Sequence, residues 1–214
     1  LNIRGADVPR TPLPLSFVIL NRDGRISLFT DTRKITNLVS AHLGNAVSVF
    51  PFKDIGKQLK SSIESQMKIR IDLKSNPTWF EQYIKKSNGL VSYGDDPITG
   101  LKAVKNPVEL KGTRNAHVRD GVAFARFLHW FDNNAPMEKL DEITVADKLK
   151  TFREEGALFK DLSFDTISGS GPNGAIVHYR VSPETNRTLK NGDLYLIDSG
   201  AQYLDGTTDI TRTL

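Results

Sequence analysis

Short apolar runs of strand-forming residues alternate with helix-like segments through residues 15–87, and this alternation predicts an α/β fold there. The first two runs, 15–20 and 26–30, flank an Asp23-Gly24 pair that is typical of a hairpin turn. After the hairpin we expect helices over about 32–43, 52–66 and 77–87, with strands over 47–50 and 68–72.

Two Asn-Pro pairs predict helix starts, because asparagine caps a helix and proline suits its first turn. Asn76 with Pro77 opens the helix near residue 77, and Asn106 with Pro107 opens the longest helical pattern, over about 107–132. In that pattern a stripe at spacings of three or four predicts the core face, formed by His117, Gly121, Phe124, Leu128 and Phe131.

A later helix is predicted to start at Thr144, with Asp147 three residues on as a capping box with a shorter acid, and to end near residue 155. From residue 162 onward, glycine, serine, proline and asparagine interrupt short apolar runs, which predicts loops and strands. We place a domain boundary near residue 104, ahead of the long helix.

Composition narrows the classes of function. The absence of cysteine excludes disulfides, thiolate metal sites and a cysteine nucleophile. The net charge of +4 arises from basic residues spread from Arg4 to Arg212, so we predict no nucleic-acid partner. No apolar stretch approaches the roughly 18 residues of a membrane span. Because the first residues show no signal pattern either, we expect a soluble, cytoplasmic protein without a membrane partner.

Asp198 ends the nearly continuous apolar run Leu194-Tyr-Leu-Ile-Asp198, which predicts a strand buried on both faces. Removing an ionised carboxylate from water is unfavourable, so a raised pKa, a tight ion pair or a metal is expected there. A second acid, Asp209, follows eleven residues later. If the chain forms a hairpin around Asp205-Gly206, Gln202 opposes Asp209, and Asp198 lies on the same face, four residues away.

That separation is about 13 Å, too long for two carboxylates to share one metal, so a bulge or a different turn must bring them together. From the spacing alone, a metal shared by Asp198 and Asp209 and a pair of hydrogen-bonded structural aspartates both remain open.

His178 ends the apolar run 174–179, after the glycine-rich stretch 168–174. Its imidazole could donate a hydrogen bond to a ligand, shuttle a proton, or serve only the structure. The glycine-rich stretch lacks a Gly-Lys-Ser/Thr ending, so we predict no nucleotide site. Other residues are interpreted as structural or solvated: His42, His117, His129, the pair Arg119-Asp120 and the run Arg153-Glu154-Glu155.

Four stretches of the second half resemble one family. They are Thr166-Ile-Ser-Gly-Ser-Gly-Pro-Asn-Gly-Ala-Ile-Val-His-Tyr179, Pro183-Glu-Thr-Asn-Arg187, Tyr195-Leu-Ile-Asp-Ser-Gly-Ala-Gln-Tyr203 and Asp205-Gly-Thr-Thr-Asp-Ile-Thr-Arg-Thr213. Upstream, Asn2-Ile-Arg-Gly-Ala-Asp7, Lys102-Ala-Val-Lys-Asn106 and Arg114-Asn-Ala-His-Val-Arg-Asp120 are similar to the same family. That family is the Xaa-Pro aminopeptidases (aminopeptidase P), in their long three-domain form, which are metallopeptidases of the pita-bread fold.

The resemblance implies that Asp198 and Asp209 help to hold two divalent metal ions, usually manganese, with Asp209 touching both, and that His178 contacts the substrate beside them. In such enzymes the metals lower the pKa of a bridging water, and the resulting hydroxide attacks the peptide carbonyl. The implied substrate is a peptide with proline in second position, from which the N-terminal residue is removed. A site shaped around the tertiary amide of proline can exclude ordinary peptide bonds.

The family's remaining metal ligands, one His and two Glu, do not occur in these 214 residues at the places its motifs require. The chain opens at Leu1 without Met and stops at Leu214 directly after a strand-like run, so we expect a fragment. The expected fold class is a creatinase-like α/β middle domain with a mixed sheet, 1–104, followed by the first half of a pita-bread α+β catalytic domain, 105–214. The isolated fragment is predicted to be inactive.

Two alternatives to the aminopeptidase stay open at this point. One is a dipeptidase for Xaa-Pro substrates (a prolidase), and the other is a pita-bread module that binds partners without catalysis. Family members are often homodimers, so the resemblance also implies a second copy of the chain as a partner.

Overall fold

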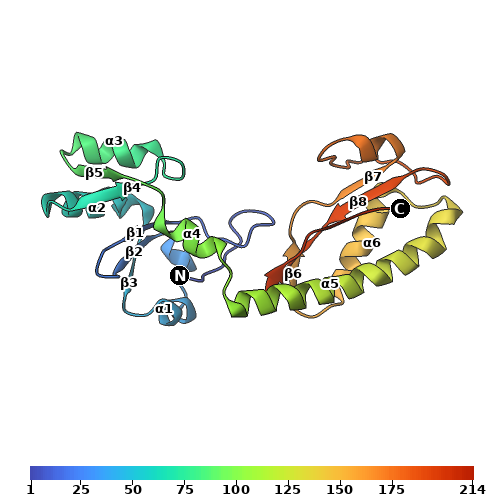
Figure 1. Ribbon diagram of the computed structural model, residues 1–214, viewed down its shortest axis with the longest axis horizontal. Helices are drawn as coiled ribbons and strands as arrows, with labels where there is room; N and C mark the ends of the chain where they lie inside the picture. The colour runs from blue at the N-terminus through green and yellow to red at the C-terminus, as the bar shows by residue number, and fades with distance from the viewer. The chain divides into compact units, whose positions relative to one another are not determined.

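The computed structural model describes all residues, 1–214, and their contacts divide the chain into two compact units, Leu1–Val104 and Lys105–Leu214. Figure 1 shows the elements of each unit. The first unit contains β1 (Phe17–Leu20), β2 (Ile26–Phe29), α1 (Asn37–Leu43), β3 (Val47–Phe50), α2 (Ile55–Glu64), β4 (Lys68–Ile71), α3 (Thr78–Lys86), β5 (Leu90–Tyr93) and α4 (Pro97–Ala103). Short 3-10 turns precede α1, at Thr32–Lys34, and α2, at Phe52–Asp54.

The first unit has mixed strand pairing, as an α/β domain with a mixed sheet requires. β1 and β2 form the predicted antiparallel hairpin, with Phe17 opposite Phe29. β3 then runs parallel to β2, and β4 runs parallel to β5 in a separate two-stranded sheet. Parallel neighbours need crossover connections, and α1 lies in the connection from β2 to β3 and α3 in that from β4 to β5, while α2 joins the two sheets. The core gathers residues from these layers: Phe29, Ile55, Leu59, Ile71 and Ile84.

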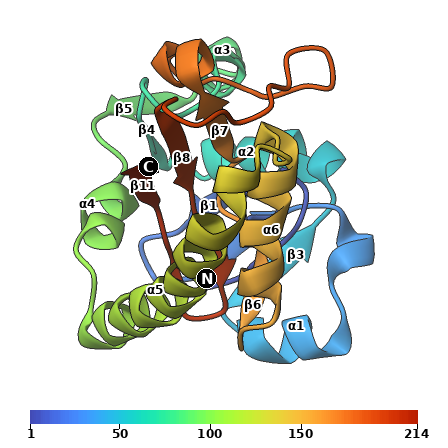
Figure 2. The ribbon, with the colours of Figure 1, turned by 90° about the vertical axis from the view of Figure 1, so that its right-hand side faces the viewer.

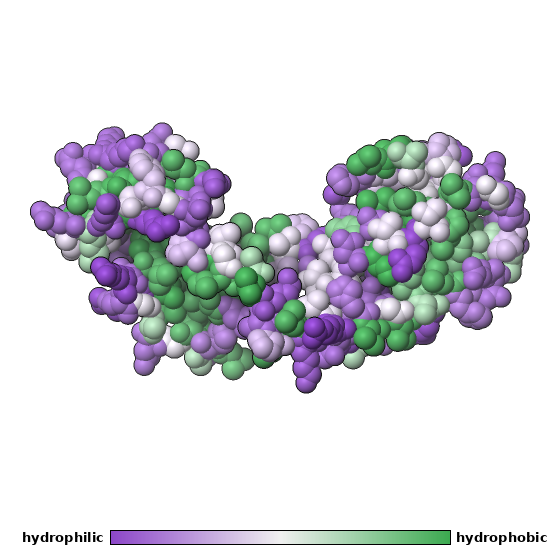
Figure 3. All heavy atoms as spheres, in the orientation of Figure 1, coloured by the Kyte–Doolittle hydropathy of each residue, from purple (hydrophilic) through white to green (hydrophobic).

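β1 is the edge strand of its sheet, and it is poorly covered. Val18 and Leu20 are about half exposed, at 48% and 49%. Figure 3 shows hydrophobic side chains gathered around these strands on the face in view. An exposed apolar edge strand is a template for pairing with another chain.

The second unit is a helical pair packed on antiparallel strands. It contains α5 (Pro107–Asn134), α6 (Glu142–Glu154), β6 (Phe159–Leu162), β7 (Ile167–Ser170), β8 (Tyr195–Ser199), β9 (Ala201–Tyr203), β10 (Gly206–Thr207) and β11 (Ile210–Thr213). The strands pair in two three-stranded sheets, in the orders β11-β8-β7 and β10-β9-β6, and all of these pairs are antiparallel. Figure 2 shows α5 beside α6, with β8 next to them. The principal core joins the two helices to β8 through Phe124, Phe127, Phe131, Val145, Leu149, Tyr195 and Ile197.

The helix starts show where local prediction succeeded and where it was wrong. Asn106 caps α5 in a full capping box, because its side chain accepts from the amide of Glu109 and the Glu109 carboxylate accepts from the amide of Asn106. Asn76, in contrast, accepts from the amide of Asp72 and leaves α3 without a side-chain cap. α6 begins earlier than predicted, because Asp141, not Thr144, is its N-cap.

The predicted core stripe of α5 was wrong in its first half. His117 and Gly121 are exposed, whereas Ala116, Asp120 and Phe124 are buried. The true stripe is displaced by one residue there, because the core accepts the charged Asp120, which an apolar pattern does not count.

Candidate metal centre

β8 places Asp198 at the border between core and solvent. Along the strand Tyr195, Ile197 and Ser199 are buried, while Leu196 and Asp198 point to the other, half-buried face. The strand is therefore fully buried on one face, not on both as predicted. One carboxylate oxygen of Asp198, Oδ1, is buried and has no hydrogen-bond partner. Such an orphaned buried acceptor is uncommon and unfavourable, and a cation would compensate it.

The hairpin brings Asp209 close to Asp198 by a turn different from the predicted one. Thr207 pairs with Gln202 and Thr211 with Asp198, so the turn lies at Leu204-Asp205 and not at Asp205-Gly206. In this register Asp209 lies on the same face as Asp198 and is displaced from it by two residues, where the predicted register gave four. Diagonal neighbours of this kind lie about 7–8 Å apart at their Cα atoms, within reach of one ligand.

Contacts with α5 select this turn. Gly206 lies in the strand β10 and packs directly on α5, where a Cβ at this position would lie 2.9 Å from the Cβ of Ala116. Asp205 occupies the turn and is held by Arg119, whose Nη1 and Nη2 donate to the two carboxylate oxygens at 3.0 and 3.1 Å. Glycine thus serves the packing of the strand on the helix, whereas the local pattern assigned it to the turn.

The hairpin is irregular at the level of the two aspartates. A Cβ on Gly200 would lie 2.0 Å from the carbonyl oxygen of Thr208, so only glycine permits this approach. Thr208 is tied in place on both sides: its amide donates to Ala201 O at 2.9 Å, and its carbonyl accepts from Ser163 Oγ at 2.9 Å. The position of Asp209, the next residue, follows from these contacts.

The electrostatics agree with two neighbouring carboxylates. Partial burial, and after it the negative charge and hydrogen bonding of Asp198, raise the pKa of Asp209. The repulsion between the two charges would be relieved by a bound cation. Carboxylate oxygens are hard ligands that suit divalent ions such as magnesium and manganese. Within the chain no group of three or more histidine, cysteine or carboxylate side chains is gathered around a common point, so the two carboxylates have no third side chain of these types beside them.

A buried ion pair lies behind the strand that carries Asp198. Arg153 of α6 is fully buried, and its guanidinium donates to both oxygens of Asp120 on α5, at 2.7 and 3.0 Å. Tyr203 also donates to Asp120, at 2.8 Å, and Arg153 donates to Ser199, the neighbour of Asp198. The network therefore links both helices to the end of β8.

Sequence reasoning assigned Asp120 and Arg153 to solvated helix faces, and this was wrong. The signal was present in the spacing, since Arg153 continues the buried stripe of Val145 and Leu149 at intervals of four. A charged residue on an apolar stripe indicates a buried partner, because an unpaired charge would not be tolerated there.

His178, Asp198 and Asp209 do not form a group of side chains around a common point, so His178 does not join the two aspartates as a third metal ligand. The run before it is not a strand: residues Gly171–Ala175 form a 3-10 turn, and Ile176 and Val177 are exposed. His178 itself is exposed and has a backbone φ of 54°, in the left-handed region. This arrangement presents the imidazole to solvent on a turn, where a ligand could reach it.

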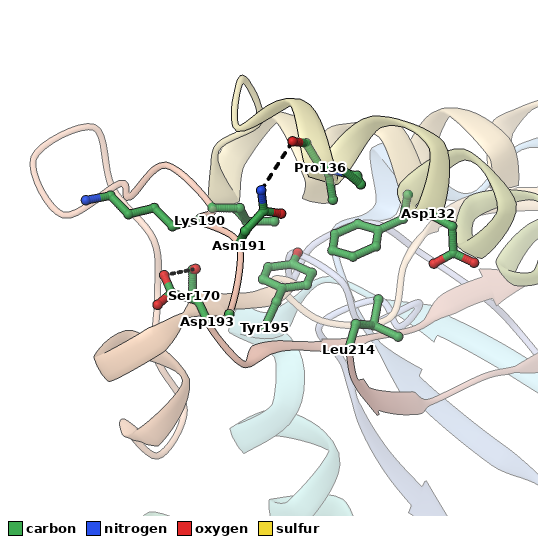
Figure 4. Close-up of a pocket in the computed structure, with 12 residues that line it drawn as sticks. Asp132, Pro136, Ser170, Lys190, Asn191, Asp193, Tyr195 and Leu214 are labelled. Atoms are coloured by element: carbon green, nitrogen blue, oxygen red, sulfur yellow. Dashed lines mark hydrogen bonds between the residues drawn. The ribbon is translucent and has the colours of Figure 1, made fainter.

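A cavity in the second unit does not contain these residues. It has a volume of about 240 Å³ and lies between the end of α5, the loop before β8 and β8 itself. Figure 4 shows Tyr195 beside a neighbouring aromatic ring in its lining, and Phe131 and Tyr195 stack with their ring centres 5.3 Å apart. Asp198, Asp209 and His178 are all absent from its lining.

No helix of the structure combines the length and apolar character that crossing a membrane requires.

Comparison with known proteins finds a different family model in each half of the chain. Residues 1–109 match the family model of the Creatinase/Prolidase N-terminal domain, and residues 111–214 match that of metallopeptidase family M24. The chain is 40% identical to Xaa-Pro aminopeptidase 1 of Dictyostelium discoideum over 219 residues, and 41% identical to Xaa-Pro aminopeptidase ApepP of Drosophila melanogaster over 219 residues. Both alignments cover 100% of this chain but only 34% and 35% of the relatives, so the chain spans about a third of their length.

A solved structure shows the same fold. The X-prolyl aminopeptidase of Caenorhabditis elegans, a cytosolic enzyme with a di-nuclear active site, matches with a TM-score of 0.88 and 31% identity, over 99% of this chain and 35% of that one. The predicted fold class, a creatinase-like α/β domain followed by the start of a pita-bread domain, is confirmed. With these two domain models matched along its length, the chain belongs to the family that carries a Creatinase/Prolidase N-terminal domain followed by a domain of metallopeptidase family M24.

Proposed function

We propose that this chain is part of a metal-dependent aminopeptidase that removes the N-terminal residue from peptides with proline in second position. The observation that carries the proposal is the pair Asp198 and Asp209, which share one face of a hairpin while a buried oxygen of Asp198 has no partner. Relatives with 40% and 41% identity are Xaa-Pro aminopeptidases, which supports this substrate class.

Asp198 and Asp209 are proposed as metal ligands, and the residues present fit that role. They offer hard carboxylate oxygens, mutual repulsion that a cation relieves, and an acceptor without a donor. The related C. elegans enzyme has a di-nuclear active site, so we propose two divalent ions, with manganese as the metal. When bound, such ions activate water and polarise the peptide carbonyl.

The remaining parts of the proposal concern the complete protein, meaning a chain of the relatives' length that contains these residues. Two carboxylates do not complete a di-nuclear site, so we assign activity to the complete protein and expect the 214 residues alone to be inactive. Residues 1–104 would be its middle domain and 105–214 the first half of its catalytic domain. We also propose that the complete protein is cytosolic, as the C. elegans enzyme is, and that it forms a homodimer.

His178 is proposed to contact the substrate. It is exposed on a turn next to the apolar and exposed Val177, so a peptide can reach the imidazole without breaking core contacts.

The test combines native mass spectrometry with a peptide assay. The complete protein in manganese buffer should carry two metal ions per chain and release the first residue of an Xaa-Pro peptide. Asp198→Asn and Asp209→Asn should each lose bound metal and lower kcat/KM by about 100-fold or more, while the control Asp132→Asn, at an exposed acid of α5, should keep both metals. Unchanged turnover in both site variants would refute the proposal.

A further inference from the structure

Glu142, in the first turn of α6, is fully buried although no cationic side chain contacts it. Its carboxylate accepts hydrogen bonds from four different residues. Oε1 accepts from the amide of Ser170 at 2.7 Å and from Asn173 Nδ2 at 2.9 Å. Oε2 accepts from the Tyr179 hydroxyl at 3.0 Å and from the amide of Arg187 at 3.1 Å. The number of donors explains how the core tolerates this acid.

These four donors belong to one loop, the connection between β7 and β8. Ser170 ends β7 at the start of the loop, Asn173 lies in its 3-10 turn, and Arg187 precedes the bridge that Thr188 makes to Asp141. Tyr179 is in the middle, buried to 6% exposure, and its hydroxyl also contacts Thr185. A single carboxylate thus gathers the beginning, middle and end of the loop.

His178 is the direct neighbour of Tyr179 on that loop. The Tyr179 side chain points inward to Glu142, whereas His178 is exposed, and the amide of Tyr179 donates to Ile176 O at 3.2 Å to close the turn. His178 itself has no hydrogen bond in the structure that would hold its backbone at a positive φ of 54°. The constraint on its position must come from its anchored neighbour.

We infer that Glu142 is a positioning residue for His178, acting through Tyr179. The inference rests on the proposed function, because it takes His178 to be a substrate contact. In the peptidase, Glu142 and Tyr179 fix the turn so that the imidazole meets the substrate without first ordering the loop, which lowers the entropy lost on binding.

A carboxylate is required at this place because every partner donates. With glutamine at position 142, one of the two oxygens becomes an NH2 group, and in either orientation it faces a backbone amide, that of Ser170 or that of Arg187. Glu142→Gln would therefore loosen one end of the loop at least, and it could disturb folding. Tyr179→Phe is the milder change, since it removes only the hydroxyl and leaves Glu142 its other donors.

The experiment is a double-mutant cycle in the complete protein, with Xaa-Pro peptide hydrolysis as one readout and amide hydrogen exchange as the other. Tyr179→Phe should raise exchange over residues 176–180 and lower kcat/KM by about 10-fold. In the His178→Ala background the same change should lower kcat/KM by less than about 2-fold, because the residue being positioned is gone. Tyr203→Phe is the matched control: it also removes a buried hydroxyl, but one bonded to Asp120, and it should not couple to His178.

The outcomes separate this inference from the proposed function. Equal losses from Tyr179→Phe in both backgrounds would assign Tyr179 a structural role and overturn the inference, with the aminopeptidase proposal intact. Unchanged exchange over 176–180 would overturn it as well. If the metal-loaded complete protein hydrolyses no Xaa-Pro peptide, the proposed function fails and the positioning role falls with it. Glu142→Gln, if folded, should repeat the coupling seen with Tyr179→Phe.

Discussion

The carbonyl oxygen of Thr208 lies only 2.0 Å from the point where a Cβ on Gly200 would be, and Ser163 Oγ lies 2.3 Å from the same point. The backbone at Gly200, the backbone at Thr208 and the Ser163 side chain therefore meet at the junction between β8 and β9. Asp209 directly follows Thr208, so the close approach at Gly200 determines the position of the Asp209 carboxylate.

Gly200→Ala should consequently displace Asp209 from its place beside Asp198. The added methyl cannot be accommodated without moving the Thr208 carbonyl, and overpacking of this kind costs about 1–3 kcal/mol of unfolding free energy. We expect a lower denaturant midpoint and weaker manganese binding in the complete protein.

Gly121→Ala serves as the control for this prediction. Gly121 lies in the middle of α5 with nothing within 4 Å of its hypothetical Cβ. Replacing a helical glycine by alanine stabilises by about 0.5–1 kcal/mol. If Gly200→Ala behaved like Gly121→Ala in both measurements, the close approach would not be a constraint on the site.

The closeness of the two carboxylates predicts that the metal-free protein loses stability as the pH rises, and that bound metal stabilises it. The pKa of Asp209 is raised above its ordinary value of 3.8, so the folded state holds this proton more tightly than the unfolded state. Without metal, stability is then highest below pH 3.8 and falls as the pH rises from 3.8 through the raised pKa. Asp209→Asn should abolish this loss.

The measurement is thermal unfolding of the complete protein with a chelator and with manganese. With the chelator at neutral pH, Asp209→Asn should melt at a higher temperature than the wild type, and the difference should vanish at a pH well below 3.8. With manganese the order should reverse, because only the wild type gains binding energy from the metal. A variant less stable than the wild type in the chelator would contradict the proposed repulsion.

Local signals predicted the helices and strands of the first unit as far as α3, and the start of α5 with its strong cap, but not β5 or α4. Asp23-Gly24 predicted the hairpin, and Asn106-Pro107 predicted the start of α5, because both depend on residues adjacent in sequence. Asn76 failed as a cap because its side chain found a competing partner in the amide of Asp72, four residues away.

The site was harder to predict, since its geometry depends on contacts distant in sequence. The strand parity correctly placed Asp198 and Asp209 on one face, but the turn was chosen by Arg119 and Ala116 of α5, about ninety residues upstream. Likewise Asp120 and Arg153 look like surface residues until their pairing is known. Position on a strand follows from local pattern, whereas register and burial of charge follow from tertiary packing.

The capping box of α5 predicts a measurable loss on Asn106→Ala. Its side chain is the acceptor for the Glu109 amide at 2.9 Å, and loss of such a cap costs about 1 kcal/mol. Chemical denaturation should show this decrease. Asn76→Ala is the matched control, and it should leave the stability of the α3 terminus unchanged, because α3 takes no cap from Asn76. Hydrogen exchange at the two helix ends tests the assignment of the cap. An equal rise in exchange at both ends would contradict it.

Asp120→Ala should be the most destabilising of the substitutions considered. Arg153 would then be left fully buried without its carboxylate, and breaking a buried pair by removing one partner costs about 3–5 kcal/mol. The exposed pair Arg126–Glu155 provides the control: Arg126→Ala should change stability by less than about 1 kcal/mol. Urea unfolding of both variants measures the difference.

The buried pair of Asp120 and Arg153 leads to a second prediction, which is tested separately. Replacing Asp120 and Arg153 together by apolar residues of similar volume should recover much of the lost stability, since the uncompensated charge is removed. The double variant would nonetheless lack the hydrogen bond from Arg153 to Ser199, next to Asp198. If the network also orders the end of β8, manganese should bind more weakly to the stable double variant than to the wild type, and equal metal affinity would limit the pair to a role in stability.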